Sequence, residues 1–273
     1  LVYISYFVVT ESGKIQQQAY NTIHQDVSTA AAFVDAEINS LDTVMQNIAY
    51  SNLVKKQFST YLNQPISSEK GNYSGMQNSK ILTNLLTAIM GPNRPVDQIY
   101  LYSLDYGAFG NGLDNSSSDE SVQNFYWYED LMNSEGNRII FCDDDKRLDK
   151  YYSYKDGSRF LTLCSVYQST FYKPEGIIEV KRSISPLIEK LKVLESKNYE
   201  AQIYIFDAEG IPVYATSDSD NISHYFSIAS DALNTLPLDE IAKISEKDTK
   251  IFFSKSAYNF CYFFFHFCIP FQI

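Results

Sequence analysis

Cysteine, histidine and long apolar runs are scarce in this chain of 273 residues. Its four cysteines form no Cys-x-x-Cys pair and its three histidines lie far apart, so the sequence contains no zinc-spaced cluster. The two apolar ends, residues 1–9 and 258–273, are both shorter than the about 20 apolar residues that cross a bilayer. Because the sequence contains no zinc-spaced cluster, we expect no metal, and we expect no other cofactor.

Positive charge is also in short supply. The chain carries 22 lysines and arginines against 33 aspartates and glutamates, a net charge of −11. The acidic residues are spread along the chain, and no basic stripe with interleaved aromatic residues is present. Such a chain repels the phosphate backbone, so the sequence excludes nucleic acid as a partner.

Glycine and proline are absent from Lys14 to Gln64, and an amphipathic pattern runs through this segment. A helix over residues 14–64 is roughly 70 Å long, so we predict a stalk helix that either pairs with another helix or follows more than one domain. Its apolar residues recur at steps of three or four, the spacing of one helical face: Ile23, Val27, Ala30, Val34, Ile38, Leu41, Met45 and Ile48.

The apolar residues 1–9 lead directly into this helix. We expect residues 1–13 to be the end of a transmembrane segment. The alternatives are the tail of a signal peptide and a soluble N-terminal strand.

Short strands and helices without regular β-α-β alternation follow the stalk. This order predicts an α+β fold with antiparallel sheets flanked by helices. The strands are expected at 96–106, 138–142, 159–168, 176–182, 201–206, 211–215, 250–254 and 258–269, and the helices at 76–90, 121–133, from Ser185 onward, 225–233 and 238–244.

Several segments resemble the double Cache family of bacterial extracellular sensors. Gln98–Ser103 resembles the first strand of its membrane-distal unit, and Glu175–Glu189 resembles the closing strand and the crossing helix of that unit. Gln202–Ala215 resembles the hairpin that opens the membrane-proximal unit, and Ser256–Pro270 is similar to its last strand. The layout is most similar to the sensor part of YesM-type histidine kinases.

The resemblance implies a long stalk helix followed by two PAS-like (Cache) units, a distal unit at 65–195 with a ligand pocket and a proximal unit at 196–273. It implies an extracellular domain at the cell membrane that binds a small molecule and signals through the stalk. The output would be a cytoplasmic kinase domain of the same chain, and this segment itself would not be an enzyme. The near-heptad spacing of the stalk further suggests a homodimer.

Phe125–Tyr128 falls where the resemblance places the pocket, so Trp127 and Tyr128 are candidate pocket-wall residues, with core packing as the alternative. In amino-acid-binding members an arginine two residues before the Trp-Tyr pair holds the ligand carboxylate, and here that residue is Phe125. Aromatic rings with polar tips suit sugars or mixed ligands. The expected ligand is therefore a sugar or an amino-acid-like molecule.

Five further residues are candidates for the same pocket. Tyr100 and Tyr102 on the first strand and Tyr167 on a later one either face the pocket or cover the sheet surface. Arg138 either binds a ligand carboxylate or lies at the surface. Asp156 either holds a ligand amine, as related sensors do at this position, or serves the turn before a glycine.

Three other functions are alternatives to the sensor of a histidine kinase. They are the sensor of a chemotaxis receptor, an extracellular glycan-processing enzyme and a structural surface protein without a pocket. An enzyme of this kind needs two carboxylates facing each other across a cleft, for example from Asp143–Asp145 and Glu129. The three aspartates are consecutive, which favours a solvated loop over a calcium loop.

Overall fold

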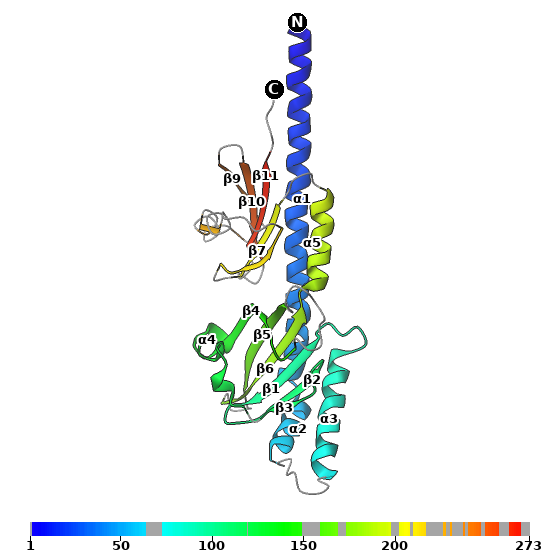
Figure 1. Ribbon diagram of the computed structural model, residues 1–273, viewed down its shortest axis with the longest axis vertical. Coiled ribbons are helices and arrows are strands. Elements are labelled where there is room, and N and C mark those ends of the chain that lie inside the picture. The colour runs from blue at the N-terminus through cyan, green and yellow to red at the C-terminus, as the bar shows by residue number, and fades with distance from the viewer. Residues whose placement is uncertain are drawn as a thin grey trace. The chain divides into compact units, whose positions relative to one another are not determined.

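The computed structural model describes residues 2–63, 73–118, 120–148, 159–168, 173–197, 202–207, 210–216, 226–227, 230, 237, 240–246, 249–256 and 262–268. The chain divides into two compact units (Figure 1). Unit 1 comprises Leu1–Glu37 and Ser185–Ile273, and unit 2 comprises Ile38–Ile184. Both combine helices with an antiparallel sheet, which confirms the predicted α+β class.

The prediction of a single helix over residues 14–64 is wrong in one respect, because this segment forms two helices. α1 extends from Val2 to Ala49, and α2 extends from Asn52 to Leu62. Between them Ser51 is extended, and its hydroxyl accepts a hydrogen bond from the Val54 amide at 3.3 Å. Serine is a favoured N-cap, so it starts a new helix without glycine or proline.

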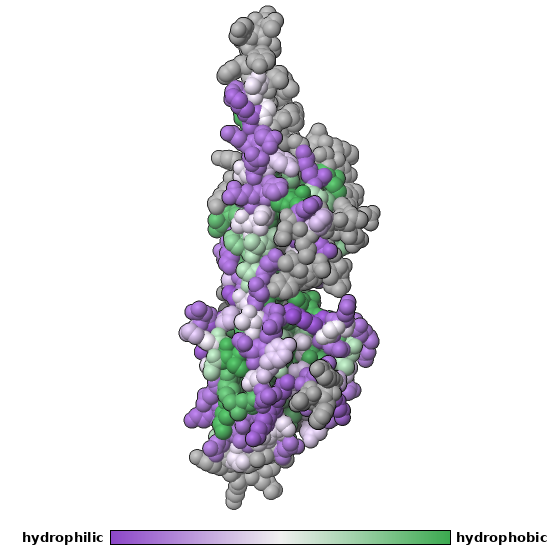
Figure 2. All heavy atoms as spheres, turned by 180° about the vertical axis from the view of Figure 1, so that it is seen from behind, coloured by the Kyte–Doolittle hydropathy of each residue, from purple (hydrophilic) through white to green (hydrophobic). Residues whose placement is uncertain are grey.

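The apolar face of α1 is buried over the whole predicted stripe, from Ile23 to Ile48. No helix in the described part of the chain has both the length and the apolarity needed to cross a membrane. Seen from behind, polar side chains predominate on the surface where α1 is exposed (Figure 2). This division into a buried apolar face and a polar outer face accounts for the amphipathic pattern.

Unit 2 is built on a six-stranded sheet in the order β3-β2-β1-β6-β5-β4, in which all pairs are antiparallel. The strands are β1 (Gln98–Ser103), β2 (Ala108–Gly112), β3 (Ser117–Ser118), β4 (Arg138–Asp144), β5 (Arg159–Gln168) and β6 (Pro174–Ser183). Besides α2 and the end of α1 from Ile38 onward, the described part of this unit contains α3 (Tyr73–Met90), the 3-10 turns η1 (Val122–Asn124) and η2 (Glu135–Asn137), and α4 (Tyr128–Asn133). The predicted helix over 121–133 is thus two short pieces separated by a turn.

The two faces of this sheet differ in what covers them. Leu101 and Ile178 are paired across β1 and β6, and they line a small space together with Ile48 and Val54 from the helices. Side chains alternate between faces along a strand, so the neighbours of Leu101 and Ile178 point the other way. That second face holds an aromatic and aliphatic core that includes Tyr100, Tyr102, Trp127, Leu131, Cys164 and Ile177.

Unit 1 has a five-stranded antiparallel sheet in the order β8-β7-β11-β10-β9. The strands are β7 (Gln202–Phe206), β8 (Pro212–Ala215), β9 (Ile241–Glu246), β10 (Thr249–Lys255) and β11 (Tyr262–Cys268). The helix α5 (Ser185–Lys197) lies beside α1, and its Lys190 ammonium is 2.8 Å from the Glu37 carboxylate (Figure 1). On the sheet side, the Tyr20 ring of α1 contacts the Phe252 ring at 5.4 Å.

Two sequence expectations concern this second sheet. The helix predicted over 238–244 is wrong, because β9 pairs with β10 over Ile241–Glu246 and the ladder overrides a short, ambiguous apolar pattern. The Phe-rich C-terminal strand is confirmed over Tyr262–Cys268, where it pairs with β7 on one side and β10 on the other. Residues 258–261 and 269–273 lie outside the described part.

Candidate ligand site in unit 2

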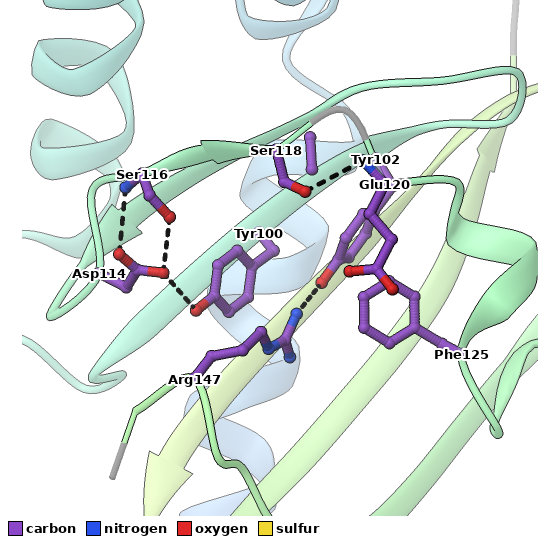
Figure 3. Close-up of a pocket in the computed structure, with 9 residues that line it drawn as sticks. Tyr100, Tyr102, Asp114, Ser116, Ser118, Glu120, Phe125 and Arg147 are labelled. Atoms are coloured by element: carbon purple, nitrogen blue, oxygen red, sulfur yellow. Dashed lines mark hydrogen bonds between the residues drawn. The ribbon is translucent and has the colours of Figure 1, made fainter. Parts of the chain in front are cut away.

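A cavity of about 370 Å³ opens on the aromatic face of the unit 2 sheet (Figure 3). This volume lies within the range of about 300–1,000 Å³ that is typical of small-molecule sites. Strands β1 and β2, the segment that follows β2, and the loop after β4 contribute its walls. The lining residues are Tyr100, Tyr102, Ala108, Asp114, Ser116, Ser118, Glu120, Phe125 and Arg147.

The apolar wall is a group of packed aromatic rings. Tyr100 and Tyr102 are two residues apart on β1 and therefore share one face of the sheet. Phe125 lies against Tyr102 at 5.4 Å and is stacked on Trp127 at 5.3 Å. Trp127 is buried behind Phe125, so it supports the wall without lining the cavity. Tyr128 begins α4 and packs against the same core.

Arg147 forms the cationic part of the cavity. Its guanidinium makes a bidentate contact with Asp145, from Nε at 2.9 Å and Nη2 at 2.6 Å. Nη2 also donates to Glu179 at 3.2 Å, and Nη1 donates to the Tyr102 hydroxyl at 2.6 Å. The guanidinium lies over the Tyr100 ring, 4.3 Å from its centroid. Four of its five N–H groups are therefore already used by the protein.

Behind Arg147 a buried lysine completes an ionic network in the sheet. The Lys181 ammonium lies 3.1 Å from Glu179, 3.3 Å from Asp145 and 3.0 Å from Asp143. It also donates to the Thr162 hydroxyl at 3.0 Å. Lys181 and Glu179 are fully buried, so each charge depends on its partners for the interactions that water would otherwise supply.

Burial and charge act in opposite directions on the pKa values of this network. Burial alone would raise the pKa of Glu179, but the positive charges of Lys181 and Arg147 hold it below the ordinary value. The pKa of Asp145 is likewise lowered against burial, by hydrogen bonds from Arg147 and the charge of Lys181. Burial, followed by the Glu179 charge, raises the pKa of the Tyr102 hydroxyl. The carboxylates are therefore ionised and Tyr102 is protonated at neutral pH.

The opposite side of the cavity is acidic. Asp114 accepts hydrogen bonds from the Ser116 hydroxyl at 2.8 Å and from the Tyr100 hydroxyl at 3.2 Å (Figure 3). Its backbone is fixed by Gln98, which accepts from the Asp114 amide at 2.7 Å and donates to its carbonyl at 2.8 Å. The Glu120 carboxylate extends into the space beside Phe125 (Figure 3).

The structure brings some of the predicted site residues together and separates others. Tyr100 and Tyr102 line the cavity, while Trp127 and Tyr128 lie behind its wall. Arg138 and Tyr167 are on the helix-covered side of the sheet. Asp156 lies outside the described residues. Ligand binding by any of these side chains stays a prediction.

Strand register explains why two predicted residues are on the far side. Arg138 is paired with Ser165, and Tyr167 follows two residues later on the same strand, so all three side chains share one face. Arg138 there forms an ion pair with Asp42 of α1 at 2.7 Å. Tyr167 lines a separate cavity of about 310 Å³ between α2 and the sheet, with Lys55 about 5.8 Å from its ring.

Sequence reasoning missed the charged residues of the site. The solvated loop predicted for the aspartate run is wrong for Asp143 and Asp145, because β4 continues to Asp144 and both side chains contact Lys181. One signal was available in the strand around Glu179 and Lys181. Two charges at alternating positions of an otherwise apolar strand indicate a shared, polar face. Arg147, Asp114 and Glu120 left no comparable local signal.

Comparison with solved structures identifies the fold. No family model and no curated protein matches the sequence. Among solved structures, the extracellular domain of vpHK1S-Z8, assigned as a histidine kinase, aligns with a TM-score of 0.63 and 12% identity over 94% of this chain and 95% of that one. The chain has the fold of an extracellular sensor domain.

Two further structures support this fold. A domain of a protein assigned to the sensory box/GGDEF family of Vibrio parahaemolyticus aligns with a TM-score of 0.59 and 12% identity, over 92% of this chain and 97% of that one. The ligand-binding domain of the Pseudomonas aeruginosa amino acid chemoreceptor PctC, solved with GABA, gives 0.53 and 10% identity over 90% and 99%. These alignments confirm the predicted double Cache fold.

Proposed function

We propose that this chain is the extracellular ligand-sensing part of a bacterial membrane receptor, with the unit 2 cavity as its small-molecule site. The observation that carries the proposal is the cavity itself. It combines an aromatic wall with convergent polar groups that are held in place by buried partners, which is the usual construction of a ligand site. The sensor fold supports the same function.

We infer the type of receptor from the fold. We propose a two-component histidine kinase of the YesM type, with unit 2 as the membrane-distal unit and a kinase domain in the same chain. A chemotaxis receptor is the equal alternative, because both receptor types occur among proteins with this fold. Both share the same extracellular task of ligand binding.

Signalling from the cavity is proposed to run through the sheet to α1. The ion network joins the cavity residue Arg147 to β4 through Asp145 and Lys181. At the other end of β4, Arg138 is paired with Asp42 of α1. A ligand that binds one arrangement of Arg147 more tightly than another would bias the position of β4, and so of α1.

A thermal-shift screen of the purified chain tests the proposed site. Amino acids, amines, organic acids and small oligosaccharides are compared, and binding of one class is expected to raise the melting temperature by several degrees. Ser118→Phe places a ring in the mouth of the cavity and is expected to abolish that shift, while the unliganded protein melts as before because Ser118 is exposed.

The matched control is Ser59→Phe, the same change at an exposed position of α2 that lines the second cavity. It should leave the shift intact. A shift that is lost in Ser59→Phe and kept in Ser118→Phe would move the site to the second cavity. The absence of a shift with every compound class would overturn a small-molecule site in unit 2.

A further inference from the structure

We propose that the cavity takes a small organic amine that carries a positive charge and no carboxylate. This inference rests on the proposed function, because it names the ligand class of the same site. It narrows the expected range of sugars and amino-acid-like molecules to one kind of compound. Three features of the cavity support it: its negative charge, the hydrogen bonds that Arg147 already makes, and the acidic wall opposite Arg147.

The charge of the site is strongly negative. Among the residues that the structure describes, the cavity lining and the ion network behind it contain five carboxylates, Asp114, Glu120, Asp143, Asp145 and Glu179, and two cations, Arg147 and Lys181. The excess is therefore three negative charges in a partly buried space, where charge is poorly screened. A ligand with a positive charge gains from this field, and a ligand with a negative charge is repelled.

Arg147 is not available as a carboxylate receptor. Asp145 already occupies the bidentate edge formed by Nε and Nη2, which is the geometry that a ligand carboxylate would need. Glu179 takes a further N–H group at 3.2 Å. A ligand carboxylate would have to displace a buried acid from this arginine and leave that acid unpaired, which is costly.

The acidic wall suits an ammonium group. Asp114 is almost fully buried and is held in place by Ser116, Tyr100 and the Gln98 amide, so its position is fixed before a ligand binds. Glu120 approaches the same cavity from the segment after β3. The aromatic rings between these two acids offer an apolar surface for the hydrocarbon part of the ligand.

Matched pairs of compounds test the inference directly. Tyramine and tyrosine, histamine and histidine, and cadaverine and lysine differ within each pair only by the α-carboxylate. Their affinities for the purified chain are measured by calorimetry at low and moderate salt. At least one amine is expected to bind, and its amino acid is expected to bind at least about tenfold more weakly. Salt should weaken the binding of the amine.

Charge-neutralising variants separate the site from general acidity. Glu120→Gln is expected to weaken amine binding about three- to tenfold without affecting folding, since Glu120 is exposed. Asp114→Asn should weaken it further. Glu129→Gln makes the same change at an exposed position of α4 outside the cavity, and it should leave binding unchanged.

The outcomes for the two proposals are distinct. If amino acids, organic acids or sugars bind and Ser118→Phe abolishes their binding, while no amine binds, the cavity is the sensing site and the amine inference is wrong. If an amino acid binds as tightly as its amine, the inference is also wrong. If no compound of any class binds, both proposals fail.

Discussion

Lys181 is a fully buried charge within the ion network of unit 2. Its ammonium has three carboxylates within 3.3 Å and no exposed surface. Two effects decide its contribution to stability: the cost of removing these charges from water and the attraction between them. A complete network of this kind often contributes little net stability, whereas an incomplete one is strongly destabilising.

We therefore predict a large effect when the lysine is removed. Lys181→Met leaves Glu179, Asp145 and Asp143 to repel one another in the sheet, and it should lower the free energy of unfolding by about 3–5 kcal/mol. Urea denaturation followed by circular dichroism measures this change. Lys192→Met, at an exposed lysine of α5, should change stability by less than about 0.5 kcal/mol. Adding Glu179→Gln to Lys181→Met should restore part of the loss, and a double variant no more stable than Lys181→Met would contradict this account.

Acid should destabilise the protein through the same residues. The pKa values of Asp145 and Glu179 are lowered in the folded protein from ordinary values of 3.8 and 4.5. Their ionisation therefore contributes stability above about pH 4.5, and that contribution is lost as the pH falls through the lowered values. The urea concentration at the unfolding midpoint, measured from pH 7 to pH 3, should decrease once the pH is below about 4.5.

A pair of neighbouring aspartates provides the control for this pH dependence. Asp145→Asn should reduce the acid-induced loss, because one of the groups that must be protonated is gone. Asp144→Asn should not, because the Asp144 side chain is 64% exposed and lies 3.6 Å from Arg159. Equal pH profiles for the two variants would show that the network does not cause the effect.

Among the elements, β2 ends at a position that requires glycine. Gly112 has φ of +138°, and a Cβ atom there would overlap the Asp97 carbonyl oxygen of the backbone. We expect Gly112→Ala to cost at least about 3 kcal/mol from strain and overpacking together. Gly91 has φ of +68° with open space around it, so Gly91→Ala should cost only about 1 kcal/mol. Chemical denaturation compares the two, and equal losses would mean that the backbone contact is relieved by movement.

The first residue of β4 connects this strand to α1. Arg138→Met removes the ion pair with Asp42, whose side chain is mostly buried, and should lower the free energy of unfolding by about 1–2 kcal/mol. Arg159→Met on the adjacent strand breaks the 3.6 Å pair with Asp144, whose side chain is 64% exposed, and should cost less than about 0.5 kcal/mol.

Ligand binding provides a second test of Arg138. Because its side chain is on the helix-covered side of the sheet, Arg138→Met should leave the affinity of any cavity ligand within twofold of the parent chain. A loss of affinity of more than about tenfold would instead indicate that Arg138 is part of the ligand site.

For the whole molecule, the predicted homodimer has to be reconsidered in the light of what α1 already buries. The stripe from Ile23 to Ile48 is covered within the chain, so it is not available to a second chain without unfolding. Ile15, eight residues before Ile23 and so about two helical turns earlier, is 63% exposed. A stalk dimer would therefore use the N-terminal part of α1.

Cysteine cross-linking in membranes of cells that express the proposed receptor tests this arrangement. Ile15→Cys should form a disulfide-linked dimer under mild oxidation, whereas Val34→Cys, which is buried, should not. The parent chain reports any dimer formed through its native cysteines. Efficient cross-linking at residue 34, or none at residue 15, would contradict a dimer through this part of the helix.

Features that depend on local periodicity can be predicted from the order of amino acids alone. Repeats of three and four residues predicted the long helix, strand alternation predicted most strands of both sheets, and the order of elements predicted the α+β class. The spacing of Tyr100 and Tyr102 placed both rings on one face of β1, which is the face that lines the cavity. Such patterns are set by the 3.6-residue and two-residue periods of the backbone.

Which face of the unit 2 sheet lines the cavity, and which charged side chains meet there, depends on the pairing of distant strands. Pairing Arg138 with Ser165 put Arg138 on the side away from the cavity, and no local pattern contains that register. The network of Asp145, Arg147, Glu179 and Lys181 joins the end of β4 to a strand more than 30 residues later. These residues cannot be brought together from local patterns, because long-range pairing depends on how the strands align with one another.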